Sequence, residues 1–275
     1  MGAAAALAAG GAAWGWFEAG WLRRRLLDVP VPGLPAALDG LRIGHLSDFH
    51  LGVPSRGRLA VVEGVEWVRE RQPDLVCITG DLLSRRAGEP LLRQLLARLD
   101  RPFVVLGNHD YARSRDPFSQ RVELVELEGA TLLADSSESV EIAGVRVQIA
   151  GVDPRSYSLG IARPQRLVDP DAALRILLCH FPSVVRRLPA NTFQLVLAGH
   201  LHAGQICIPY PGGKLLLAHP SARVREGLYR EGDTVLHISP GLGTTFVPFR
   251  FFARPEATEL VLRAEPRPGS GPRDA

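Results

Sequence analysis

Short apolar runs alternate with amphipathic segments along the first half of the chain. We predict strands at residues 41–46, 75–79 and 103–106, and the last two are continuous apolar runs, typical of strands buried on both faces. Valines at helical spacing predict a helix over residues 61–68, and leucines at the same spacing predict another over residues 91–99. This alternation of strands and helices indicates a parallel sheet with helical crossovers.

The second half of the chain is richer in strands than in helices. We predict strands at residues 145–150, 176–179, 195–198, 215–218, 235–239 and 259–262. Because few helical segments separate the later strands, we expect a second sheet, mixed or antiparallel, to pack against the first. The predicted fold class is therefore mixed α/β.

The N-terminal segment differs in composition from the rest of the chain. Residues 3–22 are apolar over about the length that crosses a bilayer, and Glu18 is their one charged residue. Four aromatic residues resemble an interfacial belt: Trp14, Trp16, Phe17 and Trp21. We expect residues 1–36 to form a membrane anchor followed by a proline-rich linker, with a soluble N-terminal helix as the alternative. By the positive-inside rule, the arginines at 23–25 would keep the following domain, and its catalytic site, on the cytoplasmic side.

Composition limits the remaining possibilities. One domain is expected over residues 40–264, and residues 265–275, rich in proline, glycine and charge, are expected to be a flexible tail. The net charge of +3 comes mainly from arginine, but no basic stripe is interleaved with aromatic residues, so we expect no nucleic-acid binding. Three widely spaced cysteines without a CxxC pair argue against a disulfide framework. The sequence does not predict the oligomeric state.

Five short polar blocks each close an apolar run. They are Asp48-Phe49-His50, Gly80-Asp81, Gly107-Asn108-His109-Asp110, Cys179-His180 and Gly199-His200-Leu201-His202, and they contain five of the eight histidines. Each block alone is a weak signal, because a lone Asp-x-His or His-x-His usually belongs to a turn. Since α/β sheets place their sites at the carboxyl ends of strands, five such blocks in order indicate imidazoles and carboxylates gathered around metal.

A pair of divalent cations about 3.5–4 Å apart needs a bridging carboxylate and several further ligands. Asp48 and His50 can face one ion, because a single residue separates them. Asp81 is the natural bridge, and Asn108 offers a neutral carbonyl oxygen. The remaining candidate ligands are His180, His200 and His202. Nitrogen and oxygen ligands of this kind suit Mn, Fe or Zn, and Mg less well.

Taken together, the five blocks resemble the motifs of the calcineurin-like metallophosphoesterase superfamily over about residues 41–263. The resemblance implies a four-layer α/β/β/α sandwich of two mixed sheets and a phosphoester hydrolase that uses a metal-bound hydroxide. It implies one ion bound by Asp48, His50, Asp81 and His202, and a second bound by Asp81, Asn108, His180 and His200.

Motifs towards the C-terminus add a narrower resemblance. They are Gly199–Gln205, Gly227–Tyr229, Ser239–Thr244 and Pro255–Glu259. They resemble a membrane-associated bacterial branch of phosphodiesterases and of enzymes that cleave UDP-2,3-diacylglucosamine in lipid A biosynthesis. This implies a phosphodiester or pyrophosphate substrate, lipid-linked in some members. Leu201 and Ala203 stand where the branch usually has threonine and glycine; neither is a ligand, so the departure bears on loop geometry and not on metal binding.

The candidate catalytic residues are His109 and Asp110. His109 would stabilise the transition state or protonate the leaving oxygen, and Asp110 would hold its imidazole in the required tautomer. Arg250 lies among the phenylalanines of residues 246–252 and is a candidate phosphate contact beside an apolar rim, with ordinary core packing as the alternative. A basic cluster that could meet a second phosphate, or be solvated surface, comprises Arg223, Arg225 and Arg230.

Two other functions are alternatives to a phosphodiesterase. One is a phosphomonoesterase of the protein-phosphatase kind, which the relative turnover of diesters and monoesters would distinguish. The other is a non-catalytic metal-binding scaffold. A scaffold would be expected to have lost ligands, whereas this sequence retains all seven candidates.

Overall fold

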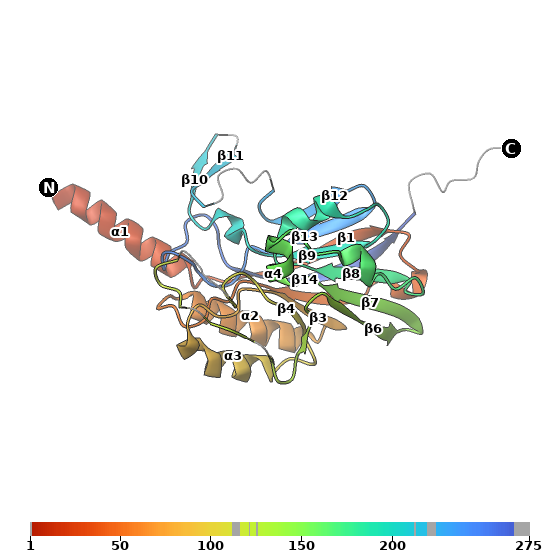
Figure 1. Cartoon of the computed structure of the whole chain (residues 1–275). Helices are drawn as coiled ribbons and strands as arrows, with labels where there is room; N and C mark the ends of the chain where they lie inside the picture. The colour runs from red at the N-terminus through yellow and green to blue at the C-terminus, as the bar shows by residue number, and fades with distance from the viewer. Residues whose placement is uncertain are drawn as a thin grey trace.

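Two six-stranded sheets pack face to face, with helices on their outer faces (Figure 1). The computed structural model describes residues 2–111, 116–120, 122–124, 126–211, 213–218 and 224–266. One outer layer consists of helices α2 (Gly57–Arg71) and α3 (Glu89–Leu96), and the other consists of short helices over the second sheet. The predicted mixed α/β fold, a four-layer sandwich, is confirmed.

The first sheet contains the three strands predicted in the first half of the chain. Its order is β1 (Arg23–Pro32), β14 (Glu256–Glu265), β2 (Arg42–Leu46), β3 (Leu75–Thr79), β4 (Phe103–Val105) and β5 (Thr131–Leu132). Strands β2 to β5 run parallel, whereas β14 is antiparallel to β2. The predicted crossovers are confirmed, since α2 joins β2 to β3 and α3 joins β3 to β4.

The second sheet is mixed as well. Its order is β12 (Gly227–Glu231), β13 (Thr234–Ile238), β9 (Leu195–Ala198), β8 (Leu174–Leu178), β7 (Val145–Gly151) and β6 (Ser136–Ile142). The four central strands are parallel, and β12 and β6 close the edges in antiparallel pairing. Helix α4 (Pro154–Ser158) and the 3₁₀ helices η3 (Pro164–Leu167) and η4 (Pro182–Arg187) cover its outer face.

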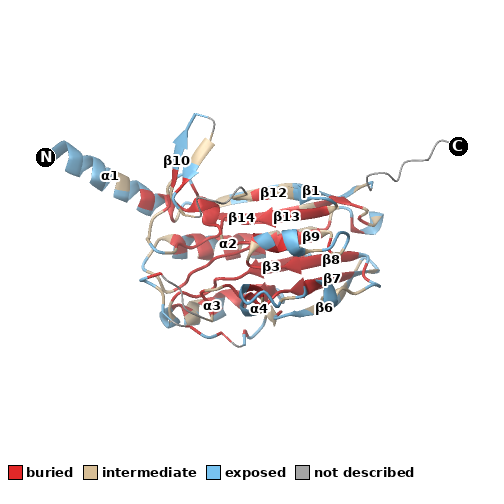
Figure 2. Ribbon diagram, turned by 45° about the horizontal axis from the view of Figure 1, so that its top comes forward, coloured by how far each residue is buried: buried red, intermediate tan, exposed pale blue. Residues whose placement is uncertain are grey.

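Three layers of apolar side chains hold these elements together. Figure 2 shows that buried residues follow the strands and the inner parts of the structure. The central layer lies between the sheets and includes Ile43 and Ile176, both fully buried. The valines that predicted α2 face the first sheet. A Cβ on Gly44 would lie 2.8 Å from Val68 Cγ1, so α2 approaches β2 this closely only because residue 44 is glycine.

The expected linker is partly a strand. Residues 23–32 form β1, which pairs in parallel with β14 from Arg23 opposite Glu256 to Pro32 opposite Glu265. Prolines obscured this strand in the sequence, but an edge strand tolerates proline because one side of its backbone needs no N–H donor. Val29 and Val31 are fully buried in the central core. The domain therefore includes β1 and begins before residue 40.

Two other predicted strands lie in unexpected places. Residues 215–216 belong to a hairpin of β10 (Cys207–Tyr210) and β11 (Gly213–Leu216), outside both sheets. Residues 259–262 belong to β14, in the first sheet. The edge strands β6 and β12 were not predicted, because their sequences are largely polar and partly exposed. Strand β14 continues to Glu265, and residues 267–275 of the expected tail lie outside the described residues.

Helix α1 (Gly2–Glu18) projects from the body of the molecule and is exposed over most of its length (Figure 1, Figure 2). Its last turn is docked on the domain. Glu18, expected within the anchor, is buried and accepts hydrogen bonds from Trp14 Nε1 at 2.9 Å and from the Ala253 N–H at 2.8 Å. Among the described helices, none combines the length and apolar character needed to cross a membrane.

The arginines that follow α1 form ion pairs within the domain. Arg23 lies 2.7 Å from Glu226 and 2.5 Å from Glu256, and Arg25 lies 3.8 Å from Glu256. Arg24 lies 3.8 Å from a glutamate of α2. The three arginines of residues 23–25 are therefore all paired with carboxylates of the domain.

The docking of β1 on the central core predicts a contrast between two positions on that strand. Val31→Ala should lower the free energy of unfolding by about 2 kcal/mol, because it removes fully buried methyl groups and leaves a cavity. Leu26→Ala, at a side chain that is 56% exposed, should change it by less than about 0.5 kcal/mol. Urea denaturation of both variants measures the difference, and equal values would show that β1 is not packed on the core.

Candidate metal centre

Loops from both sheets converge at one edge of the sandwich. The polar blocks at residues 48–50, 81 and 107–110 follow β2, β3 and β4, and those at 180 and 200–202 follow β8 and β9. Each block lies at the carboxyl end of a parallel strand, where α/β sheets place their sites. Groups of histidine and carboxylate side chains suitable for metal binding form where the blocks meet.

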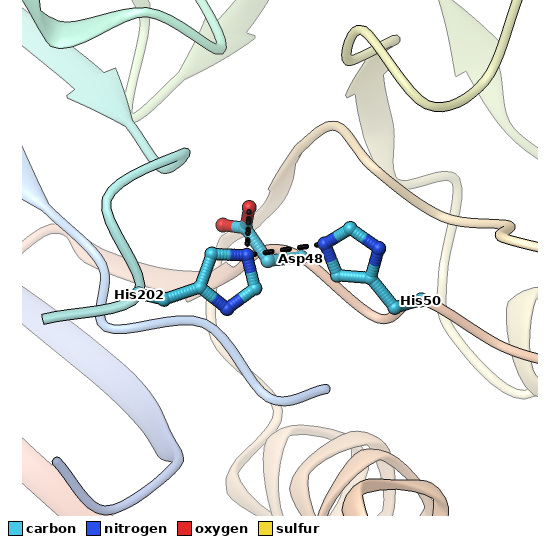
Figure 3. Close-up of side chains that lie close together, drawn as sticks. All are labelled: Asp48, His50 and His202. Carbon is cyan, nitrogen blue, oxygen red and sulfur yellow. Dashed lines mark hydrogen bonds and ion pairs between the residues drawn. The ribbon is translucent and has the colours of Figure 1, made fainter. Parts of the chain in front are cut away.

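The first cluster comprises Asp48, His50 and His202 (Figure 3). His202 Nε2 lies 3.3 Å from Asp48 Oδ1 and 3.1 Å from His50 Nε2. All three side chains are buried. Two imidazole nitrogens this close repel each other through their lone pairs unless a proton or a cation lies between them. The cluster therefore has the arrangement of a cation site.

Asp81, His180 and His200 form the second cluster. His180 Nε2 lies 3.2 Å from Asp81 Oδ2 and 3.1 Å from His200 Nδ1. His180 and Asp81 are buried, whereas His200 is half-buried and marks the side open to solvent. The two sheets contribute to both clusters, so each cluster requires the whole sandwich to be assembled.

A single oxygen of Asp81 faces both clusters. Asp81 Oδ2 lies 3.2 Å from His180 of the second cluster and 3.5 Å from His50 Nε2 of the first. The other oxygen, Oδ1, accepts a hydrogen bond from the His109 N–H at 2.8 Å. This is the position that a bridging carboxylate needs between two cations.

Asn108 supplies an independent test of whether cations fit here. Its Oδ1 is buried, and no hydrogen-bond donor among the described residues contacts it. Buried polar oxygens are almost always bonded, and a carbonyl oxygen without a donor is a suitable ligand for a divalent cation. The donor set of imidazole nitrogens, carboxylates and one amide oxygen therefore fits divalent metals.

Hydrogen bonds behind the rings set their tautomers. His180 Nδ1 lies 2.8 Å from the Thr79 carbonyl oxygen, which can only accept, so Nδ1 carries the proton. The lone pair of Nε2 then points at Asp81, as a metal ligand requires. His50 Nδ1 lies 2.9 Å from Ser84 Oγ, a hydroxyl that can accept from it or donate to it.

Buried charge dominates the electrostatics of the centre. Burial opposes ionisation of Asp48, but the nearby His202 holds the pKa of this carboxyl well below its ordinary value. Burial likewise opposes ionisation of Asp81, but the nearby His180 outweighs it and holds the pKa of this carboxyl well below its ordinary value. Burial disfavours a charged His180, yet Asp81 outweighs it and raises the imidazole pKa to about 9. In the metal-free protein, a proton on His180 therefore provides the positive charge beside Asp81. A bound cation would provide that charge in its place.

The backbone around the ligands is strained. Positive φ angles occur at Asp48, His50, Asp81, His200 and His202. Side-chain-bearing residues rarely adopt this conformation, and it persists where the surrounding structure imposes it. Glycines allow the close approach: a Cβ on Gly107 would lie 2.1 Å from Asp81 Oδ1, and one on Gly199 would lie 2.3 Å from Asp48 Oδ2.

The chain is similar to known proteins over most of its length. The family of calcineurin-like phosphoesterases matches residues 41–204, which carry all seven candidate ligands. An uncharacterized metallophosphoesterase of Bacillus subtilis, YkuE, is 30% identical to the chain over 95% of this chain and 93% of its own length. The chain belongs to the calcineurin-like phosphoesterase family.

Other relatives of this calcineurin-like phosphoesterase are longer. A transmembrane protein with metallophosphoesterase domain from Danio rerio is 34% identical over 86% of this chain, which spans 56% of that relative. Among solved structures, NAD nucleotidase of Haemophilus influenzae shares 12% identity at a TM-score of 0.43, over 74% of this chain and 45% of its own. Membership of the family makes the chain a metal-dependent phosphoric ester hydrolase that uses divalent cations.

His109 lies beside the metal ligands of this phosphoesterase, but Asp110 does not hold its ring. The His109 ring packs edge-on against His50 with centroids 4.7 Å apart, and its Nδ1 lies 3.2 Å from Ser119 Oγ. The carboxylate of Asp110 instead accepts backbone N–H groups from Leu82, Leu83 and Gly107 at 2.8–2.9 Å. Asp110 therefore braces the loops after β3 and β4, which corrects the role predicted for it.

Arg250 does not reach a substrate. It is fully buried, and its guanidinium donates to the carbonyls of Pro240, Gly241, Gly243 and Ala253. Burial lowers its pKa to about 10. Its Nη2 also lies 3.3 Å from His202 Nδ1, so Arg250 ties residues 240–243 to the ligand loop. The predicted contact with a phosphate is wrong, because these carbonyls already occupy the guanidinium.

The phenylalanine-rich segment divides into two parts. Phe249 contacts Trp16 of α1 at a centroid distance of 6.4 Å, and Phe251 packs over Gly15. Phe246 and Phe252 are about half exposed. In the predicted basic cluster, Arg230 pairs with Glu265 at 2.9 Å, Arg225 is half-buried, and Arg223 lies outside the described residues.

The two departures from the usual motif have different structural consequences. Leu201 is buried and packs in the core under the outer helices of the second sheet. Ala203 has a φ of 52°, in the left-handed region that favours glycine. The usual glycine would relieve this strain.

Several hydroxyl groups that support the ligands were missed in the sequence. Ser47 donates to Asp48, Ser84 contacts His50, and Ser119 contacts His109. Ser47 and Ser84 adjoin polar blocks, and that proximity is a usable signal. Ser119 is ten residues from its partner in a loop, where no periodicity indicates the contact.

Replacing Asp110 tests its bracing role. Asp110→Ala leaves three buried N–H groups without an acceptor and should lower the free energy of unfolding by about 3 kcal/mol or more. Asp110→Asn keeps one acceptor oxygen and should lose less. Thermal or urea unfolding measures both variants. A fully stable Asp110→Ala protein that has lost only turnover would return Asp110 to a role on the His109 ring.

Proposed function

We propose that this protein hydrolyses a phosphodiester or pyrophosphate bond at a centre of two divalent cations. The observation that carries the proposal is the position of Asp81, whose Oδ2 lies within 3.5 Å of a histidine from each cluster. Asp48, His50 and His202 would hold one cation. The second would be held by Asn108, His180 and His200, with Asp81 shared by both.

Charge in this centre favours an anionic substrate. Asp48 and Asp81 contribute the two buried negative charges, whereas the histidines and Asn108 are neutral as ligands. A pair of divalent cations would lower the pKa of a coordinated water and polarise the phosphoryl oxygen. With two carboxylates among the candidate ligands, two bound divalent cations would leave the set of ligands and ions with a net positive charge that attracts a phosphate group. Four histidines among the ligands favour Mn, Fe or Zn over Mg.

His109 is the proposed catalytic residue. Its ring lies against His50 at the centre, and Ser119 holds its Nδ1. Ser119 Oγ donates to Asp116 Oδ2 at 2.9 Å, so the hydroxyl proton points away from the imidazole. Ser119 Oγ is therefore an acceptor for Nδ1–H, and the proposed general acid is the imidazolium form of His109, which would donate its Nε2–H to the leaving oxygen.

His109→Ala tests this function directly. Turnover of bis-p-nitrophenyl phosphate with Mn²⁺ should fall by about 10²–10⁴-fold, because the general acid is lost. The metal content, measured by elemental mass spectrometry of the acid-digested protein, should stay near two ions per protein molecule. Unchanged turnover would remove His109 from the mechanism, and loss of an ion would make it a ligand. A wild-type protein that prefers the mono-p-nitrophenyl ester would favour a phosphomonoesterase.

A lipid-linked substrate and membrane association extend the proposal. Apolar side chains are exposed on α1 and on the β10–β11 hairpin, at the same end of the molecule (Figure 1). They include Leu7, Trp14, Trp16, Phe17, Ile208, Tyr210, Leu215 and Leu217. A helix that is apolar on all sides suits a lipid environment better than a groove on a protein. Phe118, next to Ser119, is 38% exposed beside the His109 side of the centre and could meet an acyl chain.

Membrane association predicts binding to lipid vesicles. The full chain should sediment with vesicles that contain anionic lipid, whereas a variant lacking residues 2–13 should bind at least tenfold more weakly, because it loses most of the exposed length of α1. The truncation leaves Trp14 and Glu18 in place, so the docked turn of α1 is preserved. Recovery of the full chain in the supernatant, or equal binding of both proteins, would contradict membrane association.

A further inference from the structure

Histidines 45 and 237 lie outside the polar blocks and have no part in the mechanism above. His45 is on β2 and His237 is on β13, so they come from different sheets. Both are fully buried, and their Nδ1 atoms lie 2.7 Å apart. Burying two neutral imidazoles in a hydrophobic core lowers the stability of the fold unless their nitrogens are hydrogen-bonded. The presence of this pair therefore calls for an explanation.

The pair is connected to the metal centre by a continuous row of hydrogen bonds. His45 Nε2 lies 2.9 Å from Thr79 Oγ1, and Thr79 Oγ1 donates to Ser47 Oγ at 2.9 Å. Ser47 Oγ then donates to Asp48 Oδ2 at 2.5 Å. Every side chain in this row is buried. The row therefore joins the interface between the sheets to a candidate ligand.

The Asp48 carboxylate at the end of this row determines which group donates in each of its hydrogen bonds. An ionised carboxylate only accepts, so the Ser47 hydroxyl must donate to Asp48. Ser47 Oγ then accepts from Thr79, and Thr79 Oγ1 accepts from His45 Nε2–H. A neutral His45 in this tautomer has an unprotonated Nδ1, which accepts from His237 Nδ1–H.

Burial keeps both rings neutral, as this order requires. Desolvation lowers the pKa of His45 to about 3, and it lowers the pKa of His237 well below the ordinary value. The outer nitrogen of His237, Nε2, is buried and has no hydrogen-bond partner in the part of the chain that the structure describes. The protein retains this unsatisfied atom, although apolar residues could fill the same space.

We propose that His45 and His237 are positioning residues for the metal centre, acting on Asp48 through Thr79 and Ser47. The inference rests on the proposed function only in taking Asp48 as a metal ligand. Holding Oδ2 with Ser47 turns Oδ1 towards His202, 3.3 Å away, and towards the cation site. The same row couples the packing of the two sheets to the geometry of the centre, since His237 belongs to the second sheet and Asp48 to the first.

Substitutions at Thr79 break the row with little change of shape. Thr79→Val removes the hydroxyl and nearly preserves the volume, whereas Thr79→Ser keeps the hydroxyl. We expect Thr79→Val to weaken Mn²⁺ binding to the metal-free protein by about 10–100-fold, as the loss of outer hydrogen bonds to metal ligands typically does. Thr79→Ser should stay within about threefold of the wild type. Isothermal titration calorimetry measures the affinities.

A matched control separates positioning from general loss of packing. Cys77→Ala alters a fully buried side chain of the same strand, in the core between the sheets, and should leave Mn²⁺ affinity unchanged. Equal binding by Thr79→Val and Thr79→Ser, or an equal loss in Cys77→Ala, would overturn the inference.

The tautomers give a readout that needs neither metal nor turnover. In ¹⁵N-edited NMR spectra of the metal-free protein, His45 should carry its proton on Nε2 and His237 on Nδ1. His45→Leu should leave the His237 signal without its downfield hydrogen-bond shift. The opposite tautomer at His45 would overturn the proposed row. A wild-type protein that shows the row and binds Mn²⁺ but hydrolyses no phosphoester would instead contradict the proposed function alone.

Discussion

The burial of two carboxylates is the constraint on which the site depends. Asp48 and Asp81 are almost completely removed from solvent, and isolated charges in such a place are strongly unfavourable. The side chains that face both carboxylates at 3.2–3.5 Å are imidazoles from loops that follow strands of both sheets. Each of the closest histidine nitrogen pairs in the centre, at 3.1 Å, needs a proton or a cation between its two lone pairs. Divalent cations resolve both problems, because they neutralise the carboxylates and accept the lone pairs.

The rest of the fold holds this unfavourable arrangement in place. Parallel strands deliver the loops to one edge, and glycines let neighbouring loops approach the ligand oxygens closely. Asp110 binds the N–H groups of the loops after β3 and β4, and Arg250 binds the carbonyls of residues 240–243. Positive φ angles at the ligand residues show that this bracing overcomes local backbone preference. The contacts formed on folding therefore hold the ligand residues in position before any metal binds.

Sequence reasoning was reliable where periodicity and chemistry coincide. The apolar runs at 75–79 and 103–106 became buried parallel strands, and the polar blocks that follow them met at one edge, because parallel topology leaves few other arrangements. It failed where tertiary context decides. The prolines of β1 suggested a linker, yet an edge position tolerates them. Arg250 suggested a phosphate contact, but its partners are backbone carbonyls that no sequence pattern reveals. The partners of Asp110 and His109 were likewise set by loop conformation.

The most direct test of the account is anomalous X-ray diffraction from crystals soaked in Mn²⁺. The account predicts two anomalous peaks about 3.5–4 Å apart, with an Asp81 carboxylate oxygen between them. Asp48, His50 and His202 should surround one peak, and Asn108, His180 and His200 the other. A single peak, or two peaks that do not share Asp81, would contradict the central claim.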